Sequence, residues 1–209
     1  MIELLHRREM MGVQGDNYEI LPYIPSFDFS TFEFDKSQIG DLSIYILSCD
    51  VPSPLGSVFW KLNNSNNEVA ESDSYQYLNI LYDGSRKYNW QNILERNNKC
   101  GLFLISNGEY SHFDNTGSNK KAINISAIST REVDNITFAS ANYANISVAP
   151  LERLFIVKNG NLILDVRPVQ INNEYYYMDL ISRNKVSISE NARITYTDEF
   201  VPYQGTLPA

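Results

Sequence analysis

Residues 124–166 contain the same short phrase three times, as Asn124-Ile125-Ser126-Ala127, Asn135-Ile136-Thr137-Phe138 and Asn145-Ile146-Ser147-Val148. A further run, Leu154-Phe155-Ile156-Val157, reaches Lys158-Asn159-Gly160-Asn161 and continues as an apolar segment to Val166. Each phrase alternates polar and apolar residues and is rich in β-branched side chains, a period of two that is typical of strands with one buried face. Evenly spaced short strands with Asn and Gly turns between them predict an antiparallel sheet stacked on another sheet.

Length and composition favour one β-rich domain with a real core. The chain has 209 residues, 43% of them hydrophobic, with 14 Tyr and 10 Phe that favour strands. The formal net charge of −8 is unfavourable for nucleic acid and for an anionic membrane surface, since both need positive charge. No segment is long and apolar enough to span a bilayer. We therefore expect neither nucleic acid nor membrane as a partner.

The rest of the body predicts more strands, one short helix and loops. Asn89-Trp90-Gln91-Asn92-Ile93-Leu94-Glu95-Arg96-Asn97 indicates the helix, because Trp90, Ile93 and Leu94 fall on one side. Residues 112–121 are expected to be a polar loop, and Arg167-Pro168 is expected to end the strand before it. The predicted strands are 42–51, 58–62, 75–82, 102–105 and 175–180, followed by a closing pair at 186–188 and 194–196. The predicted fold class is all-β: an antiparallel two-sheet β-sandwich, or jelly roll, with one short helix.

The first residues differ from everything that follows. Residues 1–11 (MIELLHRREMM) are helix-compatible and form the most basic short run of the chain. An isolated helix of this length is marginal in water, so the segment is either a disordered terminus or an arm that orders on a partner. We therefore divide the chain into an extended or helical N-terminal docking arm, 1–16, and a β-sandwich domain, 17–209. The expected partner-binding residues of the arm are the apolar anchors Leu4, Leu5, Met10 and Met11 and the pairing charges Arg7 and Arg8.

Paired carboxylates were sought because sandwich folds can host glycoside hydrolysis. Glu33 and Asp35 would share a strand face, in a segment that resembles the E-x-D-x-x-E strand of jelly-roll glycosidases. Gln38 occupies the acid/base position, however, and an amide cannot exchange the proton that the reaction requires. The run Glu71-Ser72-Asp73-Ser74-Tyr75-Gln76 has the same defect. We predict no catalytic residue and no enzymatic activity.

The sequence also predicts neither a metal site nor a cofactor. Only His6 and His112 are present, both expected at the surface or in loops, and no other ligand type lies at metal-binding spacing from either. Cys49 and Cys100 each adjoin an apolar run, and the N-terminus lacks the pattern of a secretory signal. Two buried thiols are therefore expected, although a disulfide stays open because sequence does not fix strand register.

Two segments resemble known proteins. Residues 151–185 resemble the C-terminal part of concanavalin A-like (laminin-G-like) jelly-roll domains of gut-bacterial and phage proteins. Residues 1–12 resemble the short start found in virion proteins of tailed phages that infect Bacteroides, crass-like phages included. The matching positions of the first segment are Ile156, Asn159, Gly160, Leu162, Asp165, Pro168, Tyr177, Asp179, Leu180, Ser182 and Lys185.

Together, these resemblances imply a non-enzymatic virion accessory protein: a head-fibre, capsid-decoration or neck component. Its partners would be capsid, fibre or neck subunits and further copies of itself as a homo-oligomer. It would be assembled in the host cytoplasm and located in the virion. The alternative is a glycan-binding adhesin or carbohydrate-binding module that recognises a host surface glycan, since tyrosines, Trp60 or Trp90 could stack on sugar rings. Cross-strand packing is the competing explanation for those aromatic residues.

Overall fold

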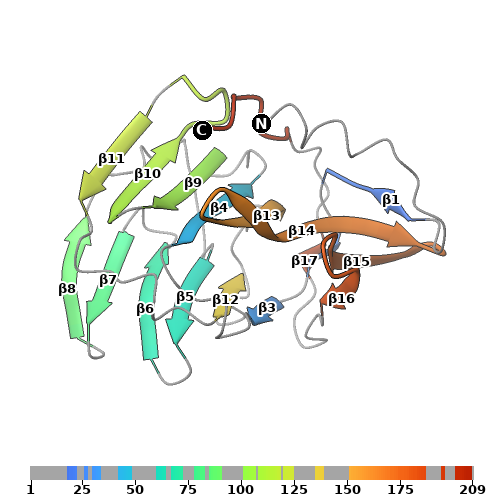
Figure 1. Ribbon diagram of the computed structural model, residues 1–209, viewed down its shortest axis with the longest axis horizontal. Helices are drawn as coiled ribbons and strands as arrows, with labels where there is room; N and C mark the ends of the chain where they lie inside the picture. Colours follow the sequence, from blue (N-terminus) through green and yellow to red (C-terminus); the bar gives the residue numbers. More distant parts are fainter. Residues whose placement is uncertain are drawn as a thin grey trace.

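The computed structural model describes residues 18–22, 26–27, 30–33, 42–48, 60–64, 67–72, 78–82, 85–90, 101–106, 108–118, 120–124, 135–138, 151–186, 194–195 and 201–208. These residues contain strands and turns and no helix (Figure 1). The all-β class is therefore confirmed for the described part of the chain. The strands are β1 (Glu19–Ile20), β2 (Ser26–Phe27), β3 (Ser30–Glu33), β4 (Leu42–Ser48), β5 (Trp60–Asn64), β6 (Asn67–Ser72), β7 (Leu78–Tyr82), β8 (Ser85–Trp90), β9 (Gly101–Ser106), β10 (Glu109–Phe113), β11 (Lys120–Asn124), β12 (Asn135–Phe138), β13 (Leu151–Lys158), β14 (Asn161–Ile171), β15 (Glu174–Asp179), β16 (Asn184–Val186) and β17 (Ile194–Thr195).

The main structural unit is one large antiparallel sheet. Eight of its strands follow the order β11-β10-β9-β4-β13-β14-β15-β16, and β1 pairs with the far part of β14. Strands distant in sequence are neighbours here, since β4 lies between β9 and β13. The other short strands pair in the orders β3-β12-β5-β6-β7-β8 and β17-β2, and every pairing in them is antiparallel. The second repeat of the sequence phrase is β12 itself.

Strand β4 is buried on both of its faces, so its sequence is a nearly continuous apolar run rather than an alternating one. The register with β9 and β13 assigns the neighbours of each face. One side, the Ile44 face, consists of Ile44, Ile46, Phe103, Ile105, Leu154 and Ile156, all nearly inaccessible to solvent. The opposite side, the Tyr45 face, consists of Tyr45, Leu47, Leu102 and Phe155, where the Tyr45 and Phe155 rings stack with centroids 4.3 Å apart.

Three tight hairpin turns rest on asparagine and glycine. Asn159 and Gly160 have φ of 51° and 76° between the paired residues Lys158 and Asn161, as a two-residue turn of the primed type requires. Asn172 and Asn173 (φ 51° and 66°) perform the same task between β14 and β15. Gly108 (φ 71°) closes the β9–β10 hairpin. The sequence predicted the turn at 158–161, and it is confirmed.

The predicted helix is wrong where the structure can test it. Asn89 and Trp90 belong to β8 and pair with Asn79 and Leu78 of β7. The pairing Tyr82↔Ser85 leaves a connection of two residues between β7 and β8. This connection places residues 85–90 beside a ready ladder partner, and a helix of about nine residues is too short to compete on its own. Residues 91–97 lie outside the described part.

The strand at Pro168 does not end as predicted, because β14 continues to Ile171. A proline is tolerated there since its missing N–H falls where the neighbour of β14 changes. Strand β13 pairs with β14 up to Val166, and β1 pairs with it from Val169 onward. The Pro168 carbonyl is still used, as it accepts the Leu21 N–H at 2.9 Å.

The predicted polar loop at 112–121 is wrong at both of its ends. His112 and Phe113 complete β10, and Lys120 and Lys121 begin β11. His112 is only 4% exposed, and its ring lies 4.8 Å from that of Phe103, so it is not a surface histidine. The predicted pairing of 186–188 with 194–196 is also wrong, because β16 pairs with β15 and β17 pairs with β2.

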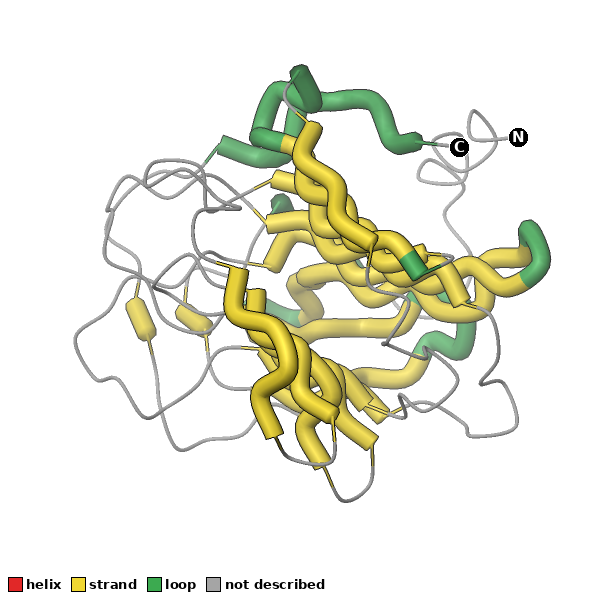
Figure 2. Tube along the Cα trace, turned by 90° about the vertical axis from the view of Figure 1, so that its left-hand side faces the viewer, coloured by secondary structure: helices red, strands yellow, loops and turns green. Residues whose placement is uncertain are grey.

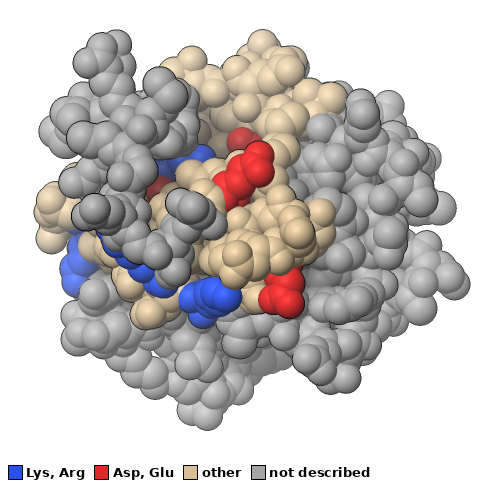
Figure 3. Space-filling model, turned by 90° about the vertical axis from the view of Figure 1, so that its right-hand side faces the viewer, with Lys and Arg blue, Asp and Glu red and all other residues tan. Residues whose placement is uncertain are grey.

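The described surface near β14–β16 carries charges of both signs. Figure 3 shows acidic and basic side chains interspersed among uncharged ones on this side of the molecule. The large apolar side chains that the described residues expose are Tyr175 at 38%, Ile181 at 47% and Val201 at 45%.

Candidate functional site

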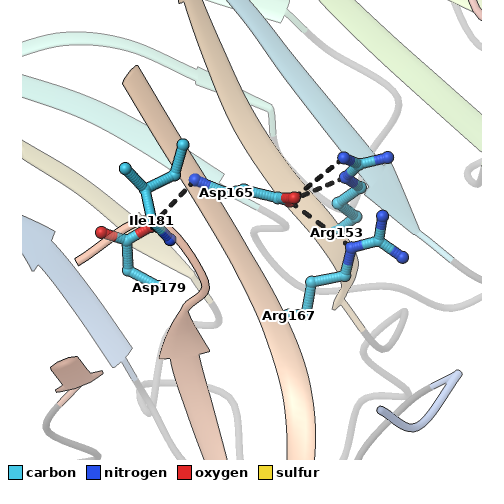
Figure 4. A network of polar contacts seen from close by, with 5 residues as sticks. All are labelled: Arg153, Asp165, Arg167, Asp179 and Ile181. Carbon is cyan, nitrogen blue, oxygen red and sulfur yellow. Dashed lines mark hydrogen bonds and ion pairs between the residues drawn. The ribbon is translucent and has the colours of Figure 1, made fainter. Parts of the chain in front are cut away.

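The most concentrated polar chemistry of the described residues lies on β13, β14 and β15 (Figure 4). Register places Asp165 opposite Phe155, and Phe155 opposite Tyr45. Strand alternation then puts Arg153 and Arg167 on the same side, so both arginines share the Tyr45 face with Asp165. A carboxylate between two guanidinium groups results directly from this register.

The centre of the network is a buried ion pair. Arg153 Nε donates to Asp165 Oδ1 at 2.8 Å and Arg153 Nη2 donates to Asp165 Oδ2 at 2.9 Å, in the fork arrangement that suits arginine and carboxylate. The two residues are 4% and 7% exposed. Phe155 supports the arginine, whose guanidinium carbon lies 4.5 Å from the ring centroid. Arg167 Nε adds a longer contact of 3.4 Å to Asp165 Oδ1.

Asp179 builds the turn between β15 and β16. Its Oδ1 accepts the backbone N–H of Asp165 at 3.0 Å and that of Ile181 at 3.1 Å, and its Oδ2 accepts the N–H of Ser182 at 3.1 Å. The Asp179 carbonyl accepts the N–H of Arg183 at 2.7 Å, and Arg183 has φ of 61°. One side chain therefore ties the turn to β14.

Glu152, which precedes Arg153 in β13, is a third carboxylate of this region and is partly buried. Its Oε2 accepts the backbone N–H of Tyr203 at 2.7 Å. Burial raises the pKa of Glu152, while the Tyr203 hydrogen bond and the charges of Arg167 and Arg153 oppose that rise. This carboxylate connects the large sheet to the C-terminal segment.

The hydrogen-bond donors around Asp165 and Asp179 indicate that these carboxylates stabilise the fold. Both oxygens of each carboxylate accept hydrogen bonds from arginines or from backbone amides of the same network. Within the described ranges, no three His, Cys, Asp or Glu side chains come together as a possible metal site. The arrangement fixes the mutual position of β13, β14, β15 and the turn after β15.

Most residues that the sequence singled out for chemistry lie elsewhere. Glu33 is in β3 opposite Asn135, and Glu71 is in β6 opposite Lys61. The six partner-binding residues of the arm lie outside the described residues, as do Asp35, Gln38, Cys49 and Cys100. Sequence reasoning missed Arg153 and Glu152. The sequence did offer a signal for Arg153, because it is a charged residue two positions before Phe155 on the same face of a largely apolar strand.

In the part of the chain that the structure describes, the fold is all-β and is built on a large antiparallel sheet with a buried arginine–aspartate pair. No protein-family model, no curated protein and no solved structure matches the chain. Among the residues that the structure describes, no helix has the length and apolarity to cross a membrane.

We expect Glu152→Gln to change the pH dependence of stability. Burial raises the pKa of Glu152, so the folded state binds a proton there more tightly than the unfolded state does. This preference stabilises the folded protein, and its contribution is complete at pH values below the ordinary glutamate pKa. That contribution is lost as pH rises through the raised value. The glutamine amide of the variant keeps an acceptor for the Tyr203 N–H without the buried charge. In urea unfolding, the wild type should therefore lose stability relative to the variant as pH rises from the ordinary glutamate pKa through the raised one.

Glu109→Gln is a matched control of opposite sign. A hydrogen bond from Ser111 and then the contacts of Lys120 lower the pKa of the Glu109 carboxyl. The stability that the ionised carboxyl contributes is therefore fully present above the ordinary glutamate pKa and is lost as pH falls through the lowered value. A pH-independent difference between Glu152→Gln and the wild type would contradict the buried-charge explanation.

Proposed function

We propose that the chain is a non-enzymatic structural accessory protein of a tailed-phage virion: a head-fibre, capsid-decoration or neck component. The observation that carries the proposal is the structural use of Asp165 and Asp179, two positions of the jelly-roll resemblance. Both carboxylates are engaged by donors that hold strands and a turn together. Such a network suits a rigid scaffold better than a reaction centre that must exchange protons.

The finer architecture proposed for this body is a two-sheet jelly-roll sandwich. Burial of the Ile44 face supports it, because a buried sheet face needs a covering layer. Leu62 and Ile136 are paired and fully buried although they lie in short strands. In Figure 2 the group formed by β5, β6, β7 and β8 lies on one side of the large sheet, where such a layer would be.

In this proposal residues 1–16 attach the body to capsid, fibre or neck subunits, with Leu4, Leu5, Met10 and Met11 as apolar anchors. Deletion of residues 1–16 is the test. We expect the shortened chain to fold, with an unchanged urea midpoint, but to be lost from purified particles. The double substitution Arg7→Glu and Arg8→Glu should reduce incorporation as well, because it reverses the pairing charges. Unchanged incorporation of the deletion variant would refute the docking arm.

A glycan-binding function is the second candidate, and one observation favours it. Strand β15 presents the exposed Tyr175 directly opposite the polar Gln170 of β14. An exposed ring next to polar groups is suited to stacking on a sugar. Binding to a host-polysaccharide array that disappears in Tyr175→Ala would support this function, and an array without hits would count against it.

A further inference from the structure

The C-terminal segment 201–208, which we call the strap, packs on the large sheet without joining its ladder. It has no regular secondary structure, yet Tyr203 and Leu207 pack against the Tyr45 face. Figures 1 and 2 show the strap running across the end of the sheet near β9, β10 and β11. It therefore covers apolar side chains of the sheet without being one of its strands.

Among the described residues, the backbone of the strap takes part in three hydrogen bonds to other elements. The Tyr203 N–H donates to Glu152 Oε2 at 2.7 Å. The Gln204 N–H donates to the Asn115 carbonyl at 2.8 Å, and Asn115 Nδ2 donates to the Pro202 carbonyl at 3.2 Å. A terminal segment with so few attachments opens at a lower free-energy cost than a strand in the middle of a sheet. We therefore expect the strap to open while the sheet stays folded.

The loop that carries Asn115 is ordered by its own hydrogen bonds. Asp114 Oδ1 accepts the Thr116 N–H at 3.2 Å and the Ser118 N–H at 2.9 Å, while the Asp114 carbonyl accepts the Gly117 N–H at 2.9 Å. None of these three bonds involves the strap. Opening of the strap therefore leaves the loop in place, and docking needs no rebuilding of the surface.

A β-bulge places Glu152 where the strap crosses β13. Leu151 pairs with Ser48 and Arg153 pairs with Leu47, so Glu152 is an extra residue between two consecutive positions of β4. Bulges of this kind redirect a side chain away from the regular alternation of the strand. The carboxylate accepts the Tyr203 N–H, so the strap backbone lies directly on Glu152 Oε2. Docking of the strap and hydration of this carboxylate therefore exclude each other.

The charged groups that face Glu152 come from three elements. Arg153 of β13 itself and Arg167 of β14 both act on its charge, and the strap contributes the Tyr203 N–H. Burial nevertheless dominates and raises the pKa of the Glu152 carboxyl. Asp114, from the loop after β10, faces the Tyr203 phenol. Burial first, and then the charges of Asp114 and Glu152, raise the pKa of Tyr203, so this phenol stays neutral in the acidic range.

We propose that the strap is a detachable cover of the Tyr45 face and that acid tightens its docking through Glu152. When the strap opens, water reaches the Glu152 carboxyl again, and its pKa returns towards the ordinary glutamate value. The contribution of this proton to docking is therefore complete below the ordinary pKa and is lost as pH rises through the raised one. Rising pH uncovers the Tyr45 face more often, and this holds for the isolated chain whatever its role in a virion.

Hydrogen exchange of the Tyr203 and Gln204 amides, followed by NMR on the full chain, tests the proposal. Both amides are hydrogen-bonded only while the strap is docked, so their protection factors, corrected for the intrinsic exchange rate at each pH, report its opening. We expect both factors to fall severalfold as pH rises from below the ordinary glutamate pKa to neutral pH. They should also stay below those of the β4 amides and respond little to dilute urea, since the sheet does not unfold.

Two variants identify the group that titrates. Glu152→Gln should make the protection of Tyr203 and Gln204 independent of pH over this range, because the amide carries no proton to lose. Glu109→Gln is the matched control at an exposed carboxylate of β10 and should keep the dependence of the wild type. An unchanged dependence in Glu152→Gln, constant protection in the wild type, or protection of the strap equal to that of β4 would each overturn the proposal.

Discussion

Asp165→Ala is expected to lower the free energy of unfolding by about 3–5 kcal/mol, because it leaves the Arg153 charge buried without its partner. The ion pair is nearly inaccessible to solvent, so water cannot easily replace the lost carboxylate. Urea unfolding followed by fluorescence measures the loss. A full-length protein with an unchanged slope and a lower midpoint would show that stability fell while the folded state stayed compact.

Two control variants separate the contribution of the Arg153–Asp165 ion pair to stability from that of its neighbours. Arg167→Ala removes the longer contact of 3.4 Å to Asp165 but keeps the Arg153–Asp165 pair, and it should cost about 1 kcal/mol or less. The double variant Arg153→Met with Asp165→Leu should recover most of the stability, since apolar replacement of a buried pair is often nearly neutral. A double variant as unstable as Asp165→Ala would mean that these residues do more than neutralise each other.

Gly101→Ala is expected to cost about 3 kcal/mol or more, because two independent effects combine at that position. Gly101 has φ of 109°, a conformation that residues with a side chain rarely adopt. A Cβ there would also contact the Phe113 carbonyl oxygen and lie 2.8 Å from the Asp114 carbonyl carbon. Since both are backbone atoms of the neighbouring strand end, they cannot rotate away, and β9 must separate from β10.

Gly160→Ala is the matched control for the backbone effect alone. Gly160 also has positive φ, at 76°, but an added Cβ would meet nothing within 4 Å. We therefore expect a cost of about 1 kcal/mol, from the left-handed conformation only. Thermal unfolding of both variants measures the contrast, and equal losses would contradict the clash at Gly101.

Local sequence signals predicted the local features of this fold. The Asn159-Gly160 turn and the strand 135–138 depend on residues adjacent in the chain, and both are confirmed. The errors arose where a distant partner decides the conformation. Trp90 is in a strand because β7 is its neighbour, and Pro168 is tolerated because the partner of β14 changes there.

The polar network shows the same limit. Arg153 and Asp165 are separated by a hairpin, and only the register of β13 with β14 reveals that they share a face. The resemblance singled out Asp165 and Asp179 without assigning their roles, and their hydrogen bonds supply those roles. The Tyr203 contact with Glu152 joins residues 51 positions apart and had no signal in the sequence.

Quantitative mass spectrometry of purified phage particles tests the proposed virion role most directly. We expect peptides of this chain to remain in particles after density-gradient purification, at a fixed ratio to the major capsid protein. Recovery only in the soluble lysate, with none in infectious particles, would contradict it.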